Sequence, residues 1–461
     1  MEKGIIATNR KIARQSPTLI KVQFFDGSVK HGKIIYSDIM VPFGLIKIES
    51  TNWAEDKSKF SQLGLGSAND DDFKVDAPIT LIGTTSEGTY VVKNGAIINT
   101  NRNYSNRYGS LFQTSFDRVS NLWGSPVLNS KGNVWGIHVI SSDTTSYSLK
   151  VDYIKNILSQ IQADKKINRG DIGVYLDLII LGIAKSNYKL SEKIADEITQ
   201  NINNTGGPPE VIIISSITPN SPSEKVLRPG DIIYKVNNKL ITNDFLIFDS
   251  VLNENVGKDI NLVVSRNGEI INVKVRVSNT EDQKFLKYLS FASSYFHEIT
   301  SLVKSSLFTK LEGVYLTYTS PGSPFSRISQ KNSYNKNNFI LTSINSTPIK
   351  SLDSLLEFFK ANCDLESIYV EGVDFNSYSS RISSQSVDLD FNSLIQVYTL
   401  NPENFKCDVE SIDLMKICTE LENSSNVAKR IKSDSKNYHS ASNIEEEGIY
   451  YNIDIINSHA G

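Results

Sequence analysis

The side chains able to perform acid–base or metal chemistry are few and scattered in this sequence. It contains five histidines, His31, His138, His297, His439 and His459. None is paired with another at a spacing typical of metal ligands, so we expect no metal site and no cofactor. The three cysteines, Cys363, Cys407 and Cys418, are an odd number without metal-like spacing. We interpret them as ordinary thiols of a protein in a reducing compartment.

Length and charge define the class of protein that must position such groups. The chain has 461 residues and 39% apolar residues, enough for about three packed domains. Lys and Arg number 48 against 51 Asp and Glu, a balance that predicts neither nucleic acid nor an anionic membrane as a partner. The longest apolar run, Tyr175–Ala184, is interrupted by Asp177 and Gly182, and Met1–Lys11 lacks the features of a signal peptide. We therefore expect a soluble intracellular protein.

The first 162 residues carry the pattern of an all-β domain. Short apolar or alternating runs bounded by turns predict strands, at Leu19–Phe25, Lys33–Ser37, Phe43–Ile48, Pro78–Ile82, Tyr90–Ile98, Ser110–Thr114 and Val134–Val139. Apolar residues at helical spacing over Val151–Ile161 predict a closing helix.

Two smaller modules and a tail follow. Residues 168–280 predict a small, partly open barrel with helices at Leu190–Ile202 and Asn243–Leu252. A weaker copy of this plan occupies 285–405, with a helix at Ser351–Phe359. From 406 to 461 the chain is polar, and we expect a flexible tail in which only Ile449–Ile456 could add a strand or dock on a partner.

Several motifs in the first domain resemble the protease domain of HtrA proteins, most closely the fungal nuclear type with duplicated protease-PDZ-PDZ units. They are Thr8-Asn9-Arg10-Lys11-Ile12, Tyr36-Ser37-Asp38, Pro42-Phe43-Gly44 and Trp123-Gly124-Ser125-Pro126-Val127-Leu128. The resemblance implies a mainly β fold: a trypsin-like double β-barrel, incomplete at its N-terminus, followed by two PDZ-like domains with short helices. It also implies that the family histidine falls on Lys11, its aspartate on Pro42 and its serine on Trp123.

The resemblance continues into both modules. Arg228-Pro229-Gly230-Asp231-Ile232-Ile233 is similar to the turn and strand of a PDZ domain, and Phe291–His297 with Glu312–Tyr315 is similar to the start of the second PDZ domain of the family. One protease-PDZ-PDZ unit is therefore expected over residues 4–405.

The three triad positions cannot perform serine-protease chemistry. Lys11 would act as a base only if burial lowered its pKa by several units, Pro42 has no carboxylate, and Trp123 has no nucleophilic oxygen. We predict no catalytic residues and a degenerate triad.

Two further residues offer alternatives. Ser125 with Lys11 would form a Ser-Lys dyad, but Ser125 matches a family serine two residues beyond the nucleophile. His138 lies near the strand that lines the family's specificity pocket, although a lone histidine on a strand is more often structural.

Peptide binding is the activity that would remain. A PDZ domain adds a peptide to a sheet edge and captures its C-terminal carboxylate in a loop of N–H groups. By resemblance this loop is Asp171-Ile172-Gly173-Val174, where Gly173 would let the backbone approach the carboxylate. Phe245 and Phe248 would line the opposite wall. Alternatively, Ile172 and Val174 are only core residues of a strand.

The leading hypothesis is a non-catalytic pseudoprotease that binds peptides or exposed C-termini, with an active HtrA relative or itself as a candidate partner. The alternatives are an active HtrA-type endopeptidase with an unrecognised site, and a decayed gene copy. Resemblance implies the nucleus, the cytoplasm or both. The Lys429-Arg430-Ile431-Lys432 cluster is either an import signal or, more commonly, a solvated charge run.

Overall fold

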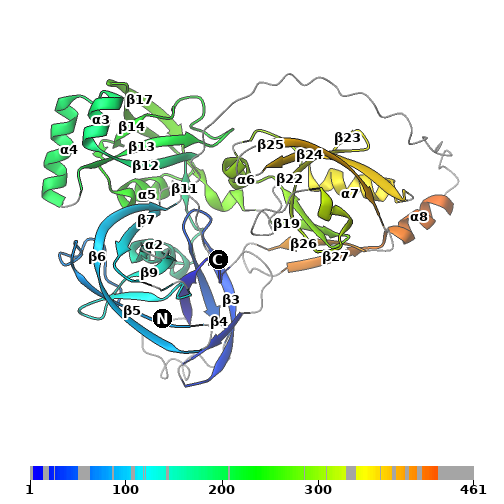
Figure 1. Cartoon of the computed structure of the whole chain (residues 1–461), viewed down its shortest axis with the longest axis horizontal. Helices are drawn as coiled ribbons and strands as arrows, with labels where there is room; N and C mark the ends of the chain where they lie inside the picture. The colour runs from blue at the N-terminus through cyan, green and yellow to red at the C-terminus, as the bar shows by residue number, and fades with distance from the viewer. Residues whose placement is uncertain are drawn as a thin grey trace.

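The computed structural model contains three β-rich units (Figure 1). It describes residues 4–13, 20–24, 26–49, 63–85, 88–104, 109–117, 119, 121–141, 145–205, 208–284, 286–307, 309–328, 339–363, 365–375, 380–389, 394–401 and 407–423. The Lys429–Lys432 cluster and the Ile449–Ile456 segment lie outside these residues. Within them, no helix is both long and apolar enough to cross a membrane, and no group of three or more metal-binding side chains occurs.

The first unit begins with an open sheet of four antiparallel strands in the order β1-β4-β3-β2. Their bounds are β1 (Ile5–Asn9), β2 (Ile20–Gln23), β3 (Val29–Ser37) and β4 (Phe43–Ile48). A small core of Ala13, Ile20, Ile34 and Ile46 packs on one face. Where the resemblance predicts a first barrel, the described residues thus form a sheet with free edges.

The second half of this unit is a closed barrel in the order β10-β7-β6-β5-β8-β9. Its strands are β5 (Pro78–Thr84), β6 (Tyr90–Tyr104), β7 (Gly109–Thr114), β8 (Pro126–Asn129), β9 (Val134–Ser141) and β10 (Ser146–Lys150), and helix α2 (Val151–Gln162) follows. Closure leaves no open strand edge. Phe73, Phe112 and Trp135 fill part of the interior with edge-to-face ring contacts. The predicted strands and closing helix of this half are confirmed.

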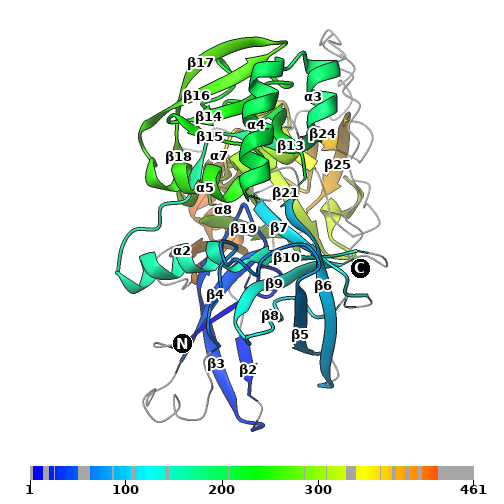
Figure 2. The same cartoon turned by 90° about the vertical axis from the view of Figure 1, so that its left-hand side faces the viewer.

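The second unit, which we call PDZ1 after the resemblance described above, is a sheet in the order β12-β13-β14-β16-β17. Its elements are β11 (Gly170–Asp171), β12 (Val174–Ile180), α3 (Leu181–Tyr188), α4 (Glu192–Thr205), β13 (Glu210–Ile217), β14 (Ile232–Val236), β15 (Lys239–Leu240), α5 (Phe245–Glu254), β16 (Asp259–Arg266), β17 (Glu269–Arg276), β18 (Ser278–Asn279) and the 3₁₀ turn η1 (Thr280–Gln283). Helices α3 and α4 lie side by side (Figure 2). Strand β12 ends the sheet, so it is the edge to which a peptide strand would add.

The third unit, which we call PDZ2 after the resemblance described above, repeats this plan and extends it. Its elements are β19 (Lys287–Phe291), β20 (Ser294–Glu298), α6 (Ser301–Leu307), β21 (Val314–Thr319), η2 (Pro324–Arg327), β22 (Phe339–Ile344), β23 (Thr347–Pro348), α7 (Leu352–Ala361), β24 (Ser367–Phe375), β25 (Ser380–Asp388), β26 (Ile395–Leu400), β27 (Cys407–Ile412) and α8 (Leu414–Asn423). The order β25-β24-β22-β21-β20-β19-β26-β27 carries the sheet past residue 405. The polar tail expected from residue 406 therefore begins with a paired strand and a helix.

A disulfide joins α8 to the end of α7. Cys363 and Cys418 are bonded, with their Cα atoms 5.8 Å apart, and Cys407 is free. The expectation of three ordinary thiols was therefore wrong for two of them. Sequence spacing could not reveal this pair, because 55 residues separate the cysteines and only the packing of α8 against α7 brings them together.

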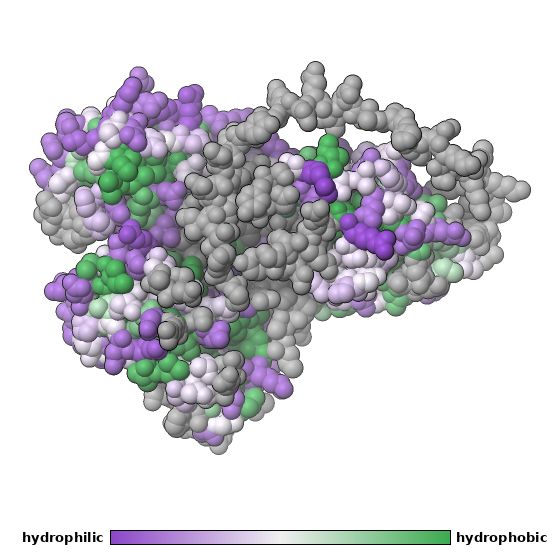
Figure 3. Space-filling model, viewed as in Figure 1, coloured by the Kyte–Doolittle hydropathy of each residue, from purple (hydrophilic) through white to green (hydrophobic). Residues whose placement is uncertain are grey.

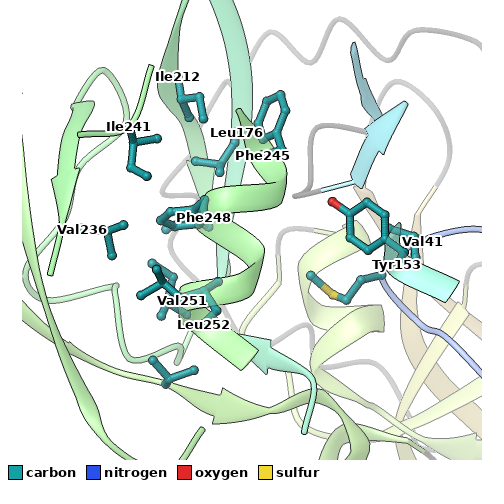
Figure 4. Close-up of a cluster of buried hydrophobic side chains, with 14 of the residues drawn as sticks. Val41, Tyr153, Leu176, Ile212, Val236, Ile241, Phe245, Phe248, Val251 and Leu252 are labelled. Atoms are coloured by element: carbon teal, nitrogen blue, oxygen red, sulfur yellow. The ribbon is translucent and has the colours of Figure 1, made fainter. Parts of the chain in front are cut away.

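The barrel and PDZ1 share one apolar core. Tyr36, Phe43 and Tyr153 of the first unit belong to the same cluster as Leu176, Phe245 and Phe248 of PDZ1. In Figure 4, Phe245 and Phe248 extend from α5 into the cluster. Val41 and Tyr153 lie on the side of the helix opposite Phe248. On the face drawn in Figure 3, by contrast, apolar residues gather only in small separate areas.

Candidate functional site

The fold brings the three positions marked by the resemblance together. Lys11 follows β1, Pro42 precedes β4, and Trp123 lies in the turn before β8. The Lys11 Nζ lies 3.7 Å from the centre of the Trp123 ring. The backbone N–H of Arg10 donates to the Pro42 carbonyl at 3.2 Å. Lys11 and Trp123, more than 100 positions apart in sequence, thus meet beside the segment that contacts Pro42, and the three positions supply an ammonium, an indole and a pyrrolidine ring.

The turn after Trp123 is held by backbone contacts. Gly124 has φ +84°, and a Cβ there would lie 2.5 Å from the Thr8 hydroxyl. Its N–H donates to the His138 carbonyl at 2.8 Å, and the His138 N–H donates to the Ser125 carbonyl at 2.8 Å. Only glycine fits this close approach to β1. These backbone contacts fix the conformation of the turn between Trp123 and β8.

Ser125 does not form the dyad considered above. A Cβ built on Gly83 would lie 2.4 Å from the Ser125 hydroxyl, so this side chain packs against β5. Among the described residues no hydrogen bond joins Ser125 to Lys11. The geometry gives Ser125 no base.

His138 is a buried residue of β9. Its Nδ1 lies 3.3 Å from the Ser146 hydroxyl, while Nε2 has no hydrogen-bond partner of ordinary geometry within the described residues. Burial lowers the pKa of His138 to about 4, and the nearby Val119 backbone offsets this only slightly. The ring is therefore neutral at pH 7.

The predicted carboxylate loop of PDZ1 has the expected backbone turn at Gly173. Its φ is +75°, and an added Cβ would lie 2.2 Å from the Ser221 Cβ. The Gly173 N–H donates to the Asp171 carboxylate at 2.7 Å. Thr218 N–H donates to the Gly173 carbonyl at 2.8 Å, and the Ser223 hydroxyl donates to the Ile172 carbonyl at 2.6 Å. The loop is ordered, and its Gly173 N–H already faces a carboxylate.

The other predicted peptide-binding residues are buried. Ile172, Val174, Phe245 and Phe248 are all 0% exposed. Their side chains form the shared core, as the alternative core interpretation of Ile172 and Val174 expects. They nevertheless lie on β12, its preceding loop and α5, the elements that form the two walls of a PDZ groove.

A buried ion-pair cluster, not predicted from the sequence, joins PDZ1 to the first unit. The Arg169 Nε donates to the Asp38 carboxylate at 2.9 Å, and its Nη1 contacts the Asp249 carboxylate on α5. Asp38 also accepts from the Tyr36 hydroxyl at 2.8 Å, and Asn253 accepts from the Gly170 N–H at 2.8 Å. We call Asp38, Arg169 and Asp249 the clamp. Asp249 could have indicated a buried ion pair from the sequence, because its carboxylate interrupts the apolar run Phe245–Leu252.

Burial and ion pairing shift the pKa values of the clamp carboxylates in opposite directions. Burial by itself raises the pKa of Asp38, but Arg169 and the N–H groups of Met40 and Val41 outweigh it, so the pKa is lowered. Burial raises the pKa of Asp249, and Arg169 offsets this only in part. Breaking such a pair costs more than forming it contributes, because one partner would leave a buried charge uncompensated.

In PDZ2 the equivalent groove edge is occupied. Strand β20, which corresponds to β12, pairs with β21 on one side and with β19 on the other. The β19–β20 turn uses Ala292 and Ser293, both with positive φ. A peptide strand cannot add where β19 already pairs.

A PDZ-domain family model matches residues 180–277. The pro-apoptotic serine protease NMA111 of Debaryomyces hansenii is 23% identical over 387 residues, covering 80% of this chain and 37% of the relative. The NMA111 protein of Saccharomyces cerevisiae is 25% identical over 410 residues, covering 86% and 39%. The chain therefore contains a PDZ domain and is similar to HtrA-type serine proteases.

Two further proteins are similar to parts of this chain. The PDZ domain-containing protein C23G3.12c of Schizosaccharomyces pombe is 23% identical, covering 89% of this chain and 41% of the relative. A solved HtrA-type protease, AlgW with a decapeptide, aligns with a TM-score of 0.43 and 20% identity over 60% of this chain and 80% of AlgW. This chain spans about two fifths of the length of the curated relatives it matches.

Proposed function

We propose that this chain is a non-catalytic HtrA-family member that binds peptides or exposed protein C-termini through PDZ1. The absence of catalysis, the first half of this proposal, rests on the contact between Lys11 and Trp123. The ammonium lies 3.7 Å from the ring centre. These are the positions that the resemblance assigns to base and nucleophile. An indole with an ammonium above it fills the space between them and provides neither a nucleophilic oxygen nor a proton acceptor.

PDZ1 supports the second half of the proposal. It retains the left-handed Gly173 in the loop before β12, a strand edge that no other strand covers among the described residues, and α5 opposite. PDZ2 lacks the free edge, because β19 fills it. We therefore assign peptide binding to PDZ1 and a structural role to PDZ2. An active HtrA relative or a second copy is a candidate partner, and the nucleus a candidate compartment.

Binding of defined peptides tests this assignment. The probe is a pool of fluorescein-labelled heptapeptides ending in a free valine carboxylate, with the same peptides amidated at the C-terminus as a reference. The intact chain should prefer the free carboxylate, and Gly173→Ala should abolish the preference, because a Cβ there meets Ser221. Gly182→Ala is the matched control, since nothing lies within 4 Å of its added Cβ. Equal binding of both peptide sets by the intact chain would contradict the proposal.

The rival function is an active HtrA endopeptidase in apoptosis or protein quality control; the names of the NMA111 relatives describe those proteins as pro-apoptotic serine proteases. It requires a nucleophile with a base in reach. Labelling of the native chain with a fluorophosphonate probe separates the peptide-binding function from the protease function.

A further inference from the structure

The disulfide at the end of PDZ2 joins a core residue to a surface helix. Cys363 follows α7, and Cys418 lies in the second turn of α8. Cys363 is buried in the core cluster of PDZ2, whereas Cys418 is half-buried and packs against that cluster from outside. In Figure 1, α8 lies beside α7 at the outer end of this unit. The bond is therefore the covalent tie between α8 and the rest of PDZ2.

The non-covalent packing of α8 is slight. Burial is described for residues 414–420 of this helix, and among them only Leu414 is fully buried. Ile417 and Cys418 are half-buried, and the other four are exposed. Hydrophobic stabilisation is roughly proportional to the apolar area removed from water. Packing therefore contributes little to the docking of α8 on α7.

The helix is also weak by itself. It has 10 residues, fewer than the about 12–15 below which an isolated helix is marginal in water. It has no acidic residue in its first turn and no basic residue in its last turn, so charged side chains do not complement its dipole. At its start, the Lys416 N–H donates to the Asp413 carboxylate at 3.1 Å. A helix this short and exposed depends on the disulfide, which keeps it at a high effective concentration beside α7.

We infer that the Cys363–Cys418 bond is a redox latch, which docks α8 on α7 when oxidised and releases α8 when reduced, while the rest of PDZ2 stays folded. The reductant is a dithiol. Its first thiolate attacks the Sγ of Cys418, the less buried residue, and the Sγ of Cys363 leaves as a thiolate and takes up a proton. The second thiol of the reductant then displaces Cys418. Two protein thiols form, and the reductant becomes a disulfide.

The third cysteine is not the attacking group. Cys407 lies at the start of β27, and burial raises the pKa of its thiol. Little thiolate is therefore present at neutral pH, and the thiolate is the nucleophile in disulfide exchange. The latch responds to an external dithiol instead. In the nucleus or cytoplasm, the candidate compartments, disulfides are rare, and those that form are usually transient, with catalytic or redox-sensing roles.

The test compares the full chain purified without reductant with the same chain treated with dithiothreitol. Hydrogen exchange of the α8 amides is measured at labelling times for which the β21 and β22 amides remain protected. We expect α8 exchange at least about 30-fold faster after reduction, the lower end of what a cross-link typically contributes. Cys418→Ser should exchange at the reduced rate without dithiothreitol. Cys407→Ser is the matched control, because it keeps the bond and should follow the parent chain in both forms.

Three results would overturn the latch. Equal α8 exchange in the oxidised and reduced chains would show that packing alone holds the helix. Loss of β21 and β22 protection at the same labelling times would show that the bond holds the whole of PDZ2 together. Trapping of free thiols followed by mass spectrometry measures the third, a bond that dithiothreitol reduces only after urea has unfolded the chain.

Discussion

The Lys11 ammonium lies 3.7 Å from the centre of the Trp123 indole ring. Lys11 is exposed and Trp123 is half-buried. A cation over an aromatic face at an exposed site contributes about 0.5–1 kcal/mol. This contact links the residues after β1 of the open sheet to the turn before β8 of the closed barrel, at two of the positions that the resemblance assigns to the triad.

A double-mutant cycle measures this contact. Lys11→Met, which retains the aliphatic stem, and Trp123→Leu should each lower the free energy of unfolding, with a coupling energy of about 0.5–1 kcal/mol. Urea unfolding of the parent, both single variants and the double variant provides it. Strictly additive effects would mean that the two side chains do not interact in solution.

Removing the cation of the clamp should be far more damaging. Arg169→Met leaves Asp38 and Asp249 buried without a counter-ion, which typically costs about 3–5 kcal/mol. Arg276→Met is the control, because its pair with Asp259 is 3.5 Å long and exposed, and exposed pairs contribute about 0–1 kcal/mol. Adding Asp249→Asn to Arg169→Met should restore part of the loss. Equal denaturation midpoints for the two single variants would contradict the clamp.

How much of this could the sequence predict? The strands of the barrel and the helices at 151–162 and 245–254 follow from local periodicity, and they lie close to where that pattern predicts them. The family motifs also placed Lys11 and Trp123 at positions expected to lie close together, and these two residues do contact each other. The strands and helices can be predicted because each depends on residue spacing within one element. The Lys11–Trp123 contact was predictable only through the family motifs.

The clamp, the disulfide and the contact of β6 with PDZ1 depend on residues from distant segments. Arg169 meets a carboxylate 131 residues away, and Asn103 meets a carbonyl 73 residues away. No periodicity encodes such pairs. The phenylalanines of α5 were predicted as groove lining from resemblance alone, and their complete burial depends on how PDZ1 packs on the barrel.

His138 should make stability depend on pH. Its pKa in the folded chain is about 4 against an ordinary value of 6.5, so the unfolded chain binds more protons between these values. Stability from this residue is present above pH 6.5 and is lost as the pH falls toward 4, by about 3 kcal/mol. Urea unfolding at pH 7.5 and pH 4.5 should show a smaller difference for His138→Asn than for the parent. Identical differences would exclude His138 as the source.

The disulfide predicts a thiol count. Protein purified without reductant and denatured should show one reactive thiol, that of Cys407, and three after reduction. Cys418→Ser should lower stability by about 2–4 kcal/mol, because the cross-link closes a long loop. Cys407→Ser should leave stability unchanged. Three thiols before reduction would show that α8 is not bonded to α7.

Labelling with a fluorophosphonate probe, together with hydrolysis of unfolded casein, tests the central claim that this chain is not a protease. The positive control is the variant Lys11→His with Pro42→Asp and Trp123→Ser, which places a triad at the three positions. The account predicts that the native chain neither takes up the probe nor cleaves casein. Labelling of the native chain at Ser125 or another serine, lost when that serine is replaced by alanine, would contradict it.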